Sequence, residues 1–142
     1  MEQRFTMVTL AVDDVAATRR FFENGLGWRG TETPTGDIAF YQAGGSVLAV
    51  YDRRALERDL DRPVPPDATG AVTLAWNGRS RDEVDAAYAK AIAAGAEAVK
   101  IPEEVFWGGY SGYVIIPGGH LLEIAYNPFW PLAEDGTVTL PK

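Results

Sequence analysis

The sequence predicts an α+β fold made of two βαβββ modules, and three observations lead to this prediction. The tetrapeptide Val-Thr-Leu-Ala occurs twice, at residues 8–11 and 72–75. Each copy opens a segment whose hydrophobic pattern changes from that of a strand to that of a helix and then to several strands. Each segment also passes a Gly-Gly turn before a strand that ends in tyrosine, at Tyr51 and Tyr126. The chain therefore contains an internal duplication, and its second copy is longer in the middle.

The first module is expected at residues 1–60. Side chains alternate from Phe5 to Val12, which predicts a strand with two unlike faces, and the aspartate pair that follows can cap a helix over residues 15–24. Short strands are expected between residues 30 and 52, with turns at Pro-Thr-Gly and Gly-Gly. One or two helical turns are expected at residues 53–60.

The second module is expected at residues 70–127. Ser80 and Glu83 have the spacing of a capping box ahead of a helix, and Gly95 fits the C-terminal cap of that helix. Three strands are expected to complete the module, near residues 98–101, 113–116 and 121–126.

Two segments lie outside the predicted modules. Residues 61–69 are rich in proline and aspartate and predict the linker between the modules, because proline removes backbone donors and resists regular structure. The tail, residues 128–142, contains Phe129 and Trp130 and is apolar enough that we expect it to pack back onto the body.

Composition narrows the class of protein. The chain has 142 residues, 46% of them hydrophobic, which suits one compact unit built from the two modules. A net charge of −7 and the lack of long basic runs disfavour nucleic acid as a partner. No stretch approaches the roughly 20 apolar residues of a membrane span, so no membrane partner is expected. The chain has no cysteine and no signal-like start, so a cytoplasmic location is expected.

Three motifs add a family resemblance to this order of elements. They are Val-Thr-Leu-Ala-Val-Asp-Asp at residues 8–14, Arg-Phe-Phe-Glu with Gly-Leu-Gly-Trp over residues 20–28, and Pro-Gly-Gly-His-Leu-Leu-Glu-Ile at residues 117–124. Together they resemble the vicinal oxygen chelate superfamily of glyoxalase, bleomycin resistance and extradiol dioxygenase proteins. The last motif departs from the family's Asp-Pro-Asp-Gly-His turn, because Ile116 and Gly118 replace both aspartates. The resemblance implies a curved mixed sheet with the helices on the outside and a ligand cleft between the modules.

The resemblance also implies where a metal ion would bind. Metal-dependent members take one ligand from the first strand and one from the last strand of each module. The corresponding positions are Met7, Ala71, Leu48 or Ala49, and Glu123. Of these, only Glu123 carries a ligand that suits zinc, iron or manganese. The sole histidine, His120, lies three residues before Glu123 on a predicted strand and so points to the opposite face. We therefore expect no metal and no cofactor, with His120 closing the turn.

Small side chains are expected on the face of the sheet that points away from the helices, which leaves room for a cavity. Met7, Thr9 and Thr73 lie on that face, and Glu123 projects into the same space. A carboxylate in such surroundings needs a partner. Glu123 can be a remnant ligand position bonded to a threonine or a tyrosine, an anchor for an amine or hydroxyl of a ligand, or a general base.

Aromatic residues alternate with glycines from Val105 to Tyr113, in the longer part of the second module. Glycines permit unusual backbone dihedrals and aromatic rings offer large contact areas, which suits a lid over a pocket. Trp107, Tyr110 and Tyr113 are the ligand-binding candidates in this stretch, and Tyr41 is a weaker candidate at the comparable place in the first module. The alternative is a glycine-rich turn whose aromatics fill the core.

The function that these residues favour is binding of a small organic molecule in an aromatic-lined cavity without the usual metal. A cationic or aromatic ligand is one class that fits the acidic chain, and a homodimer is expected from the exposed sheet edges of such modules. The alternative is a lyase, isomerase or dioxygenase of the same superfamily. It would either use Glu123 and a tyrosine, Tyr110 or Tyr113, as base and acid, or hold an atypical metal site.

Overall fold

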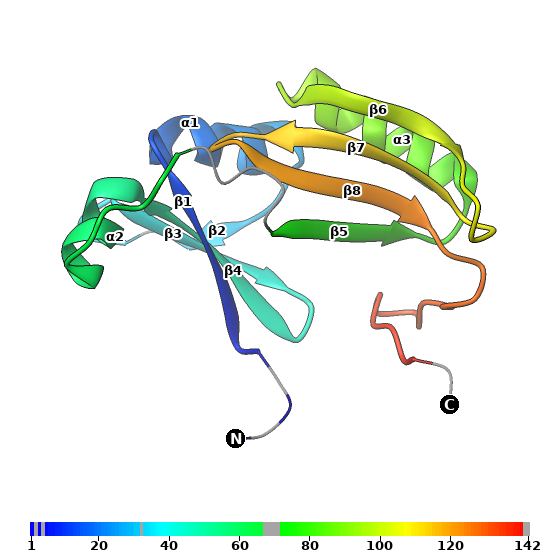
Figure 1. Ribbon diagram of the computed structural model, residues 1–142, viewed down its shortest axis with the longest axis horizontal. Helices are drawn as coiled ribbons and strands as arrows, with labels where there is room; N and C mark the ends of the chain where they lie inside the picture. The colour runs from blue at the N-terminus through cyan, green and yellow to red at the C-terminus, as the bar shows by residue number, and fades with distance from the viewer. Residues whose placement is uncertain (2, 4, 32, 67–71, 141–142) are drawn as a thin grey trace.

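The computed structural model describes residues 1, 3, 5–31, 33–66 and 72–140. Within these residues the chain forms two βαβββ modules, each with a four-stranded mixed sheet, and this confirms the predicted α+β fold (Figure 1). The strand order is β1-β4-β3-β2 in the first sheet and β5-β8-β7-β6 in the second. In both, the first strand of the module pairs in parallel with the last one, and the remaining pairs are antiparallel.

The elements follow the predicted order. Those of the first module are β1 (Met7–Val12), α1 (Val15–Arg20), the π-helical turn η1 (Phe21–Gly25), β2 (Gly30–Thr31), β3 (Ile38–Ala43), β4 (Ser46–Asp52) and α2 (Arg53–Leu60). Those of the second are β5 (Thr73–Gly78), α3 (Arg81–Ala93), β6 (Glu97–Glu104), β7 (Tyr110–Ile116) and β8 (His120–Tyr126). Residues 67–69 of the predicted linker lie outside the described residues.

The helix predicted over residues 15–24 is regular only as far as Arg20. It begins where Asp14 accepts a hydrogen bond from the Ala17 amide, as the capping prediction requires. From Phe21 the turns widen, and the Leu26 amide bonds the Phe21 carbonyl. Phe21 and Phe22 are 3% and 2% exposed. The wider turn allows both of these neighbouring rings to be buried, although successive residues of a regular helix do not share a face.

Helix α3 has both predicted caps. The Ser80 hydroxyl accepts a hydrogen bond from the Glu83 amide at 3.2 Å, which fixes the first turn. At the other end Gly95 has φ of 110°, and the Ala96 amide bonds the Ala91 carbonyl. A side chain at residue 95 would be strained in this left-handed conformation, so glycine ends the helix here.

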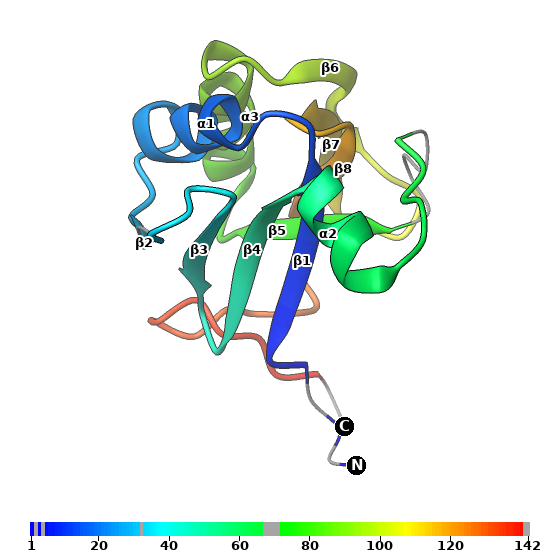
Figure 2. The ribbon, with the colours of Figure 1, turned by 90° about the vertical axis from the view of Figure 1, so that its left-hand side faces the viewer.

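One hydrophobic core joins the helices to the facing sides of both sheets. The alternate residues Leu10 and Val12 of β1, Val114 and Ile116 of β7, and Ile124 of β8 belong to it. The faces of the two sheets that point away from α1 and α3 are called the open face below; α2 lies at the end of this face in the first sheet, where Asp59 accepts a hydrogen bond from Tyr51 (Figures 1 and 2). The helices cover only part of each sheet: Val8 and Trp76 share the helix side with Leu10 and Leu74 by alternation, yet they are 36% and 40% exposed.

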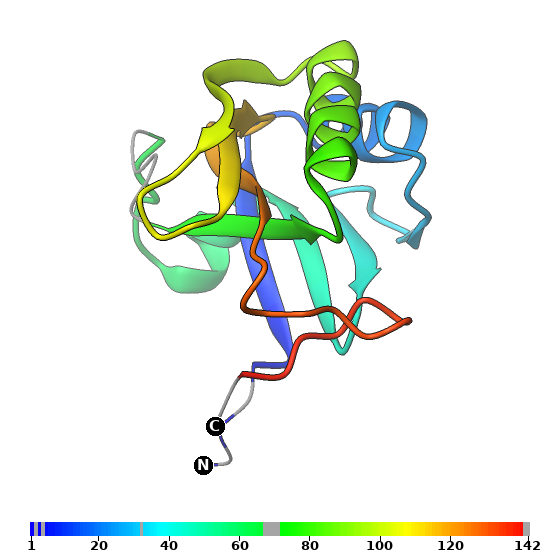
Figure 3. The ribbon, with the colours of Figure 1, turned by 90° about the vertical axis from the view of Figure 1, so that its right-hand side faces the viewer.

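The two modules touch directly through their helices and one hairpin. The C-terminal end of α3 meets the turn η1 that follows α1, where a Cβ added at Gly25 would clash with that of Ala94 (Figures 1 and 3). The imidazole Nε2 of His120 lies 2.8 Å from the carbonyl oxygen of Ala11. His120 therefore does more than close its turn, because it bonds β8 of one module to β1 of the other.

The segments outside the modules are held by arginines. Arg53 donates to the Pro65 carbonyl of the linker at 3.1 Å, and Arg79 donates to the carbonyls of Ala133 and Glu134 in the tail. The tail turns below β5 (Figure 1), yet Phe129 stays 61% exposed. Within the described residues, no helix is both long and apolar enough to cross a membrane.

Candidate functional site

Strand pairing lines up three polar side chains across the open face of the second sheet. Lys100 on β6 pairs with Tyr113 on β7, Tyr113 pairs with Glu123 on β8, and Glu123 pairs with Ala75 on β5. Residues directly opposite in a sheet point to the same side. The side chains of Tyr110, Leu122 and Tyr126 pack on the core side, so the row formed by Lys100, Tyr113 and Glu123 lies on the open face.

Tyr113 and Glu123 form the chemical centre of this row. Burial raises the pKa of the Tyr113 phenol, and the negative charge of Glu123 and a hydrogen bond to its carboxylate act in the same direction. Tyr113 therefore keeps its proton at a position directly opposite Glu123. Of the partners that the sequence offered for this carboxylate, the structure thus places a tyrosine nearby.

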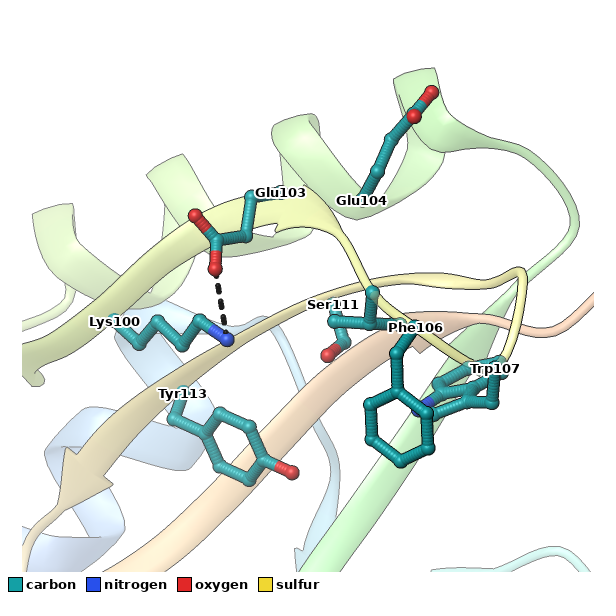
Figure 4. Close-up of a pocket in the computed structure, with 8 residues that line it drawn as sticks. Lys100, Glu103, Glu104, Phe106, Trp107, Ser111 and Tyr113 are labelled. Carbon is teal, nitrogen blue, oxygen red and sulfur yellow. Dashed lines mark ion pairs between the residues drawn. The ribbon is translucent and has the colours of Figure 1, made fainter.

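A hollow of about 340 Å³ lies next to the row, at the end nearest β6. The turn at residues 105–109 forms one wall with Phe106 and Trp107, and the strands contribute Lys100, Ser111 and Tyr113 (Figure 4). Lys100 Nζ lies 2.9 Å from Glu103 Oε1, and Glu104 points away from the hollow to an ion pair with Arg81. The hollow thus combines aromatic rings with two hydroxyl groups, one ammonium group and the Glu103 carboxylate that pairs with it.

The turn is shorter than the expected lid, because Tyr110 and the residues after it belong to β7. The Val105 amide bonds the Gly109 carbonyl, and the Gly108 amide bonds the Val105 carbonyl. Trp107 lies flat against Gly109, where an added Cβ would overlap the indole ring. Glycine is therefore required at 109 to let the indole lie along the backbone. Phe106 is fully exposed.

Tyr110 lies on the other side of the sheet from Glu123. Its hydroxyl donates to Asp85 on α3 at 2.9 Å, and the guanidinium of Arg81 lies 5.5 Å from its ring centre. The bond to Asp85 raises the pKa of Tyr110. Of the two tyrosines proposed as partners of Glu123, the structure brings only Tyr113 to it. Strand alternation separates the two, because residues 110 and 113 are an odd number apart.

The remaining open-face candidates lie on the first strands of the two modules. Thr9 pairs with Ala49 in the first sheet, and Thr73 pairs with Leu121 in the second. Both threonines are exposed, and Met7 is 45% exposed near the start of β1. None of the three lines the hollow.

Tyr41 is placed in the core of the first module. It is 1% exposed, its ring packs 5.1 Å from that of Phe22, and its hydroxyl donates to Glu23 at 3.2 Å. Arg19 donates to the same carboxylate at 2.8 Å, and this bond lowers the pKa of Glu23. Burial raises the pKa of Tyr41 to about 12, with the charge of Glu23 adding to the effect. Tyr41 thus contributes to packing and is not brought together with Glu123.

The buried phenol of Tyr41 predicts a loss of stability in alkali. A tyrosine in the unfolded chain ionises with the ordinary pKa of 10.0, whereas the folded one keeps its proton to about 12. The stabilisation is complete below pH 10 and is lost as the pH rises from about 10 to 12. Between pH 8 and 11 the loss amounts to about 1 kcal/mol. Urea unfolding at both pH values should show a smaller decline for Tyr41→Phe than for the wild type; parallel declines would contradict the assignment.

The donor set at the implied metal positions does not suit a divalent ion. Leu48 is 7% exposed in the core cluster, so Ala49 is the β4 position that shares the open face, and its methyl group cannot bind a metal. Met7 offers a thioether, Glu123 one carboxylate, and Ala71 lies outside the described residues. No group of three or more histidine, cysteine, aspartate or glutamate side chains that could hold a metal ion occurs among the residues described.

Sequence reasoning does not single out Lys100 and Ser111. The pairing of β6 with β7 shifts register twice, between Ala98 and Lys100 and between Lys100 and Glu103. Such irregularities change which side chains face the cavity and cannot be read from alternation alone. Ser111, by contrast, could have been found, because it lies two residues before Tyr113 on the same strand and so shares its face.

Comparisons with known proteins agree with this architecture. The family model described as Glyoxalase/Bleomycin resistance protein/Dioxygenase superfamily matches residues 4–124. The chain is similar to the crystal structure of a glyoxalase-related enzyme from Fulvimarina pelagi, with 35% identity, a TM-score of 0.92, and coverage of 99% of this chain and 100% of that one. Comparison with curated proteins finds no significant match.

Two more distant structures share the fold. A glyoxalase/bleomycin resistance protein/dioxygenase from Nocardioides is 23% identical, with a TM-score of 0.76 over 89% of this chain and 84% of that chain. A lactoylglutathione lyase from Agrobacterium tumefaciens is 21% identical, with a TM-score of 0.70 over 92% of this chain and 98% of that chain. At these identities the likeness concerns the fold alone.

Proposed function

The chain belongs to the glyoxalase/bleomycin resistance protein/dioxygenase superfamily, and we propose that it binds a small organic molecule on the open face of its second sheet. The observation that carries this proposal is the row formed by Lys100, Tyr113 and Glu123 beside the hollow. Trp107 supplies an aromatic contact surface, and Glu123 supplies a polar anchor. A hollow that combines aromatic rings with a few convergent polar groups is a common form of a small-molecule site.

We propose that this binding needs no metal ion. The support is the chemistry of the implied ligand positions: Glu123 is a single carboxylate, and Ala49 and Met7 supply only a methyl group and a thioether at two of the other positions. Tyr113 lies directly opposite this carboxylate on the neighbouring strand. A ligand with an amine or hydroxyl group can bind the same carboxylate, and the chain's net charge of −7 favours a cationic aromatic molecule over an anionic one.

Two titrations test this function. Calorimetry with Zn²⁺, Ni²⁺, Mn²⁺ and Fe²⁺ should show no tight stoichiometric site. A thermal-shift screen of cationic aromatic compounds should find ligands that raise the melting temperature, because a ligand that binds only the folded state stabilises it. A tight cation site would overturn the metal-free proposal, and a screen without a stabilising compound would count against the binding function.

Enzymatic proton transfer without a metal is the second candidate, and one observation favours it. Tyr113 lies directly opposite Glu123, and its phenol keeps its proton because burial raises its pKa. A carboxylate base beside a protonated phenol is an arrangement that can move a proton to and from a small carbonyl compound.

In this alternative, Tyr113→Phe is expected to slow turnover by about 10²–10⁴-fold, because it removes the acid while leaving the ring in place. Tyr110→Phe is the matched control, since Tyr110 bonds Asp85 on the far side of the sheet. NMR can follow deuterium uptake by small carbonyl compounds in D₂O. No uptake with the wild type, or equal losses in the two variants, would rule this alternative out.

We also propose that the chain forms a homodimer. Large apolar side chains stay exposed on the second module and the tail, including Ile101 at 70%, Phe106 at 102% and Phe129 at 61%. Strand β6 also forms the edge of its sheet. Exposed apolar surface and open edges favour association. Light scattering should give twice the chain mass of 15.4 kDa, and Ile101→Glu should shift the protein toward the mass of a single chain; a monomeric wild type would contradict the proposal.

A further inference from the structure

We infer that the ligand of this site is a planar aromatic molecule with a hydrogen-bond donor at one end and an acceptor, such as a carboxylate, at the other. This inference rests on the proposed function and specifies its ligand. The donor end would meet Glu123. The acceptor end would meet Ser111 and Lys100, two groups to which neither the family resemblance nor the sequence assigns a role.

Ser111 is the first reason. Its side chain is buried, with only 2% of the residue exposed, and it lines the hollow. Within the described part of the chain, its hydroxyl makes no hydrogen bond. Figure 4 shows this hydroxyl on the side of the strand that faces the rings of Tyr113 and Phe106. Among the described residues the buried side-chain atom without a partner is the Tyr88 hydroxyl, so the Ser111 hydroxyl is open to the hollow that it lines and can bond a ligand atom there.

Lys100 is the second reason. Its ammonium group carries three N–H donors, and the ion pair with Glu103 at 2.9 Å occupies only one side of the group. Donors on the other sides can bond a ligand acceptor. The side chain of Lys100 is 42% exposed at the hollow, so a ligand acceptor can reach it from solvent. Ser111 and Lys100 therefore present donors, whereas the only carboxylate in the row is that of Glu123.

The third reason is the order of charges across the sheet. Lys100, Tyr113 and Glu123 lie on three successive strands, so the backbone positions of Lys100 and Glu123 are two strand spacings apart, or about 10 Å. The ring of Tyr113 lies between them and Trp107 stands beside them, so a flat aromatic ring suits the space. A ligand with unlike ends can contact both charged groups at once, which a simple cation cannot do.

Three small probes separate this inference from the broader function: 4-(aminomethyl)benzoate, benzylamine and benzoate. Dissociation constants can be measured by NMR titration of the protein. The aminomethylbenzoate is expected to bind about tenfold more tightly than benzylamine, because a charge-assisted hydrogen bond adds to the amine contact. Ser111→Ala and Lys100→Met should each bring the ratio of the benzylamine to the aminomethylbenzoate dissociation constant, measured within the same variant, from about ten toward one. Lys90→Met, at an exposed site on α3, is the matched control.

The results separate failure of the bifunctional ligand from failure of the proposed binding function. If benzylamine binds and its binding depends on Glu123, but the carboxylate adds nothing in wild type or variants, the bifunctional ligand is refuted while the binding function stands. If none of the probes shifts resonances of the second sheet, the binding function fails and this inference fails with it. Melting temperatures of the variants within a few degrees of wild type would show that the losses come from contacts rather than unfolding.

Discussion

Replacing Phe22 by alanine is expected to lower the free energy of unfolding by about 3–5 kcal/mol, because it removes a large ring from a packed core. Phe22 is 2% exposed. Its ring centre lies 5.2 Å from that of Phe21, 5.1 Å from that of Trp28 and 5.1 Å from that of Tyr41. Removal of the Phe22 ring would therefore leave a cavity between three other aromatic rings.

Phe5→Ala is the matched control for this prediction. The same atoms are removed, but Phe5 is 86% exposed, so its effect on stability should stay within about 0.5 kcal/mol. Urea unfolding followed by far-UV circular dichroism measures both variants. Similar losses in the two would show that burial at the widened helix turn does not set the stability of the first module.

The parts of the fold that local chemistry determines could be predicted from the sequence. The capping box at Ser80, the glycine at residue 95 and the repeated strand pattern each depend on neighbours within a few residues, and the structure confirms them. The face of Glu123 also follows from alternation, because β8 pairs with β7 without a break. Side-chain alternation and helix caps can be read from the sequence because each acts within a single strand or helix.

The remaining features depend on contacts between elements. The helix over residues 15–24 widens at Phe21 because two adjacent rings are drawn into one core, and no local signal marks this. Lys100 reaches the hollow through the shifted pairing of β6, and His120 bonds a carbonyl 109 residues earlier in the chain. Tyr41 fills the core instead of a pocket because Glu23 and Arg19 satisfy its hydroxyl there.

The register of β4 shows how the structure decides between alternatives that the sequence left open. Counting from the final tyrosine matches Glu123 with Leu48, whereas counting from the Gly-Gly turn matches it with Ala49. Leu48 belongs to the core cluster, so only Ala49 lies on the open face. The extra residue in the turn of the second hairpin causes the difference, since Ile116 pairs with His120 where Ala43 pairs with Ser46. At this position the first module therefore has a small residue, Ala49, and the second has a carboxylate, Glu123. The two positions together do not supply a pair of metal ligands.

Glu123→Gln is expected to weaken the binding of a cationic aromatic ligand about 10- to 100-fold, because a charge-assisted hydrogen bond becomes a neutral one. The amide keeps the size of the side chain and can still accept a bond from Tyr113, so the fold should be unaffected. Calorimetric titration of a compound from the thermal-shift screen measures the change directly.

Glu103→Gln tests whether the ligand contacts the Glu123 carboxylate directly or responds only to the negative charge of the surface. Glu103 lies at the same hollow, but its side chain is 56% exposed and its carboxylate pairs with Lys100. Its removal changes the net charge by the same amount as removal of Glu123, yet we expect less than a threefold change in the affinity for the cation, because solvent screens an exposed charge. Equal losses in the two variants would mean that the ligand responds to the field of an acidic surface; a loss confined to Glu123→Gln requires a contact with that one carboxylate, on the strand beside Tyr113.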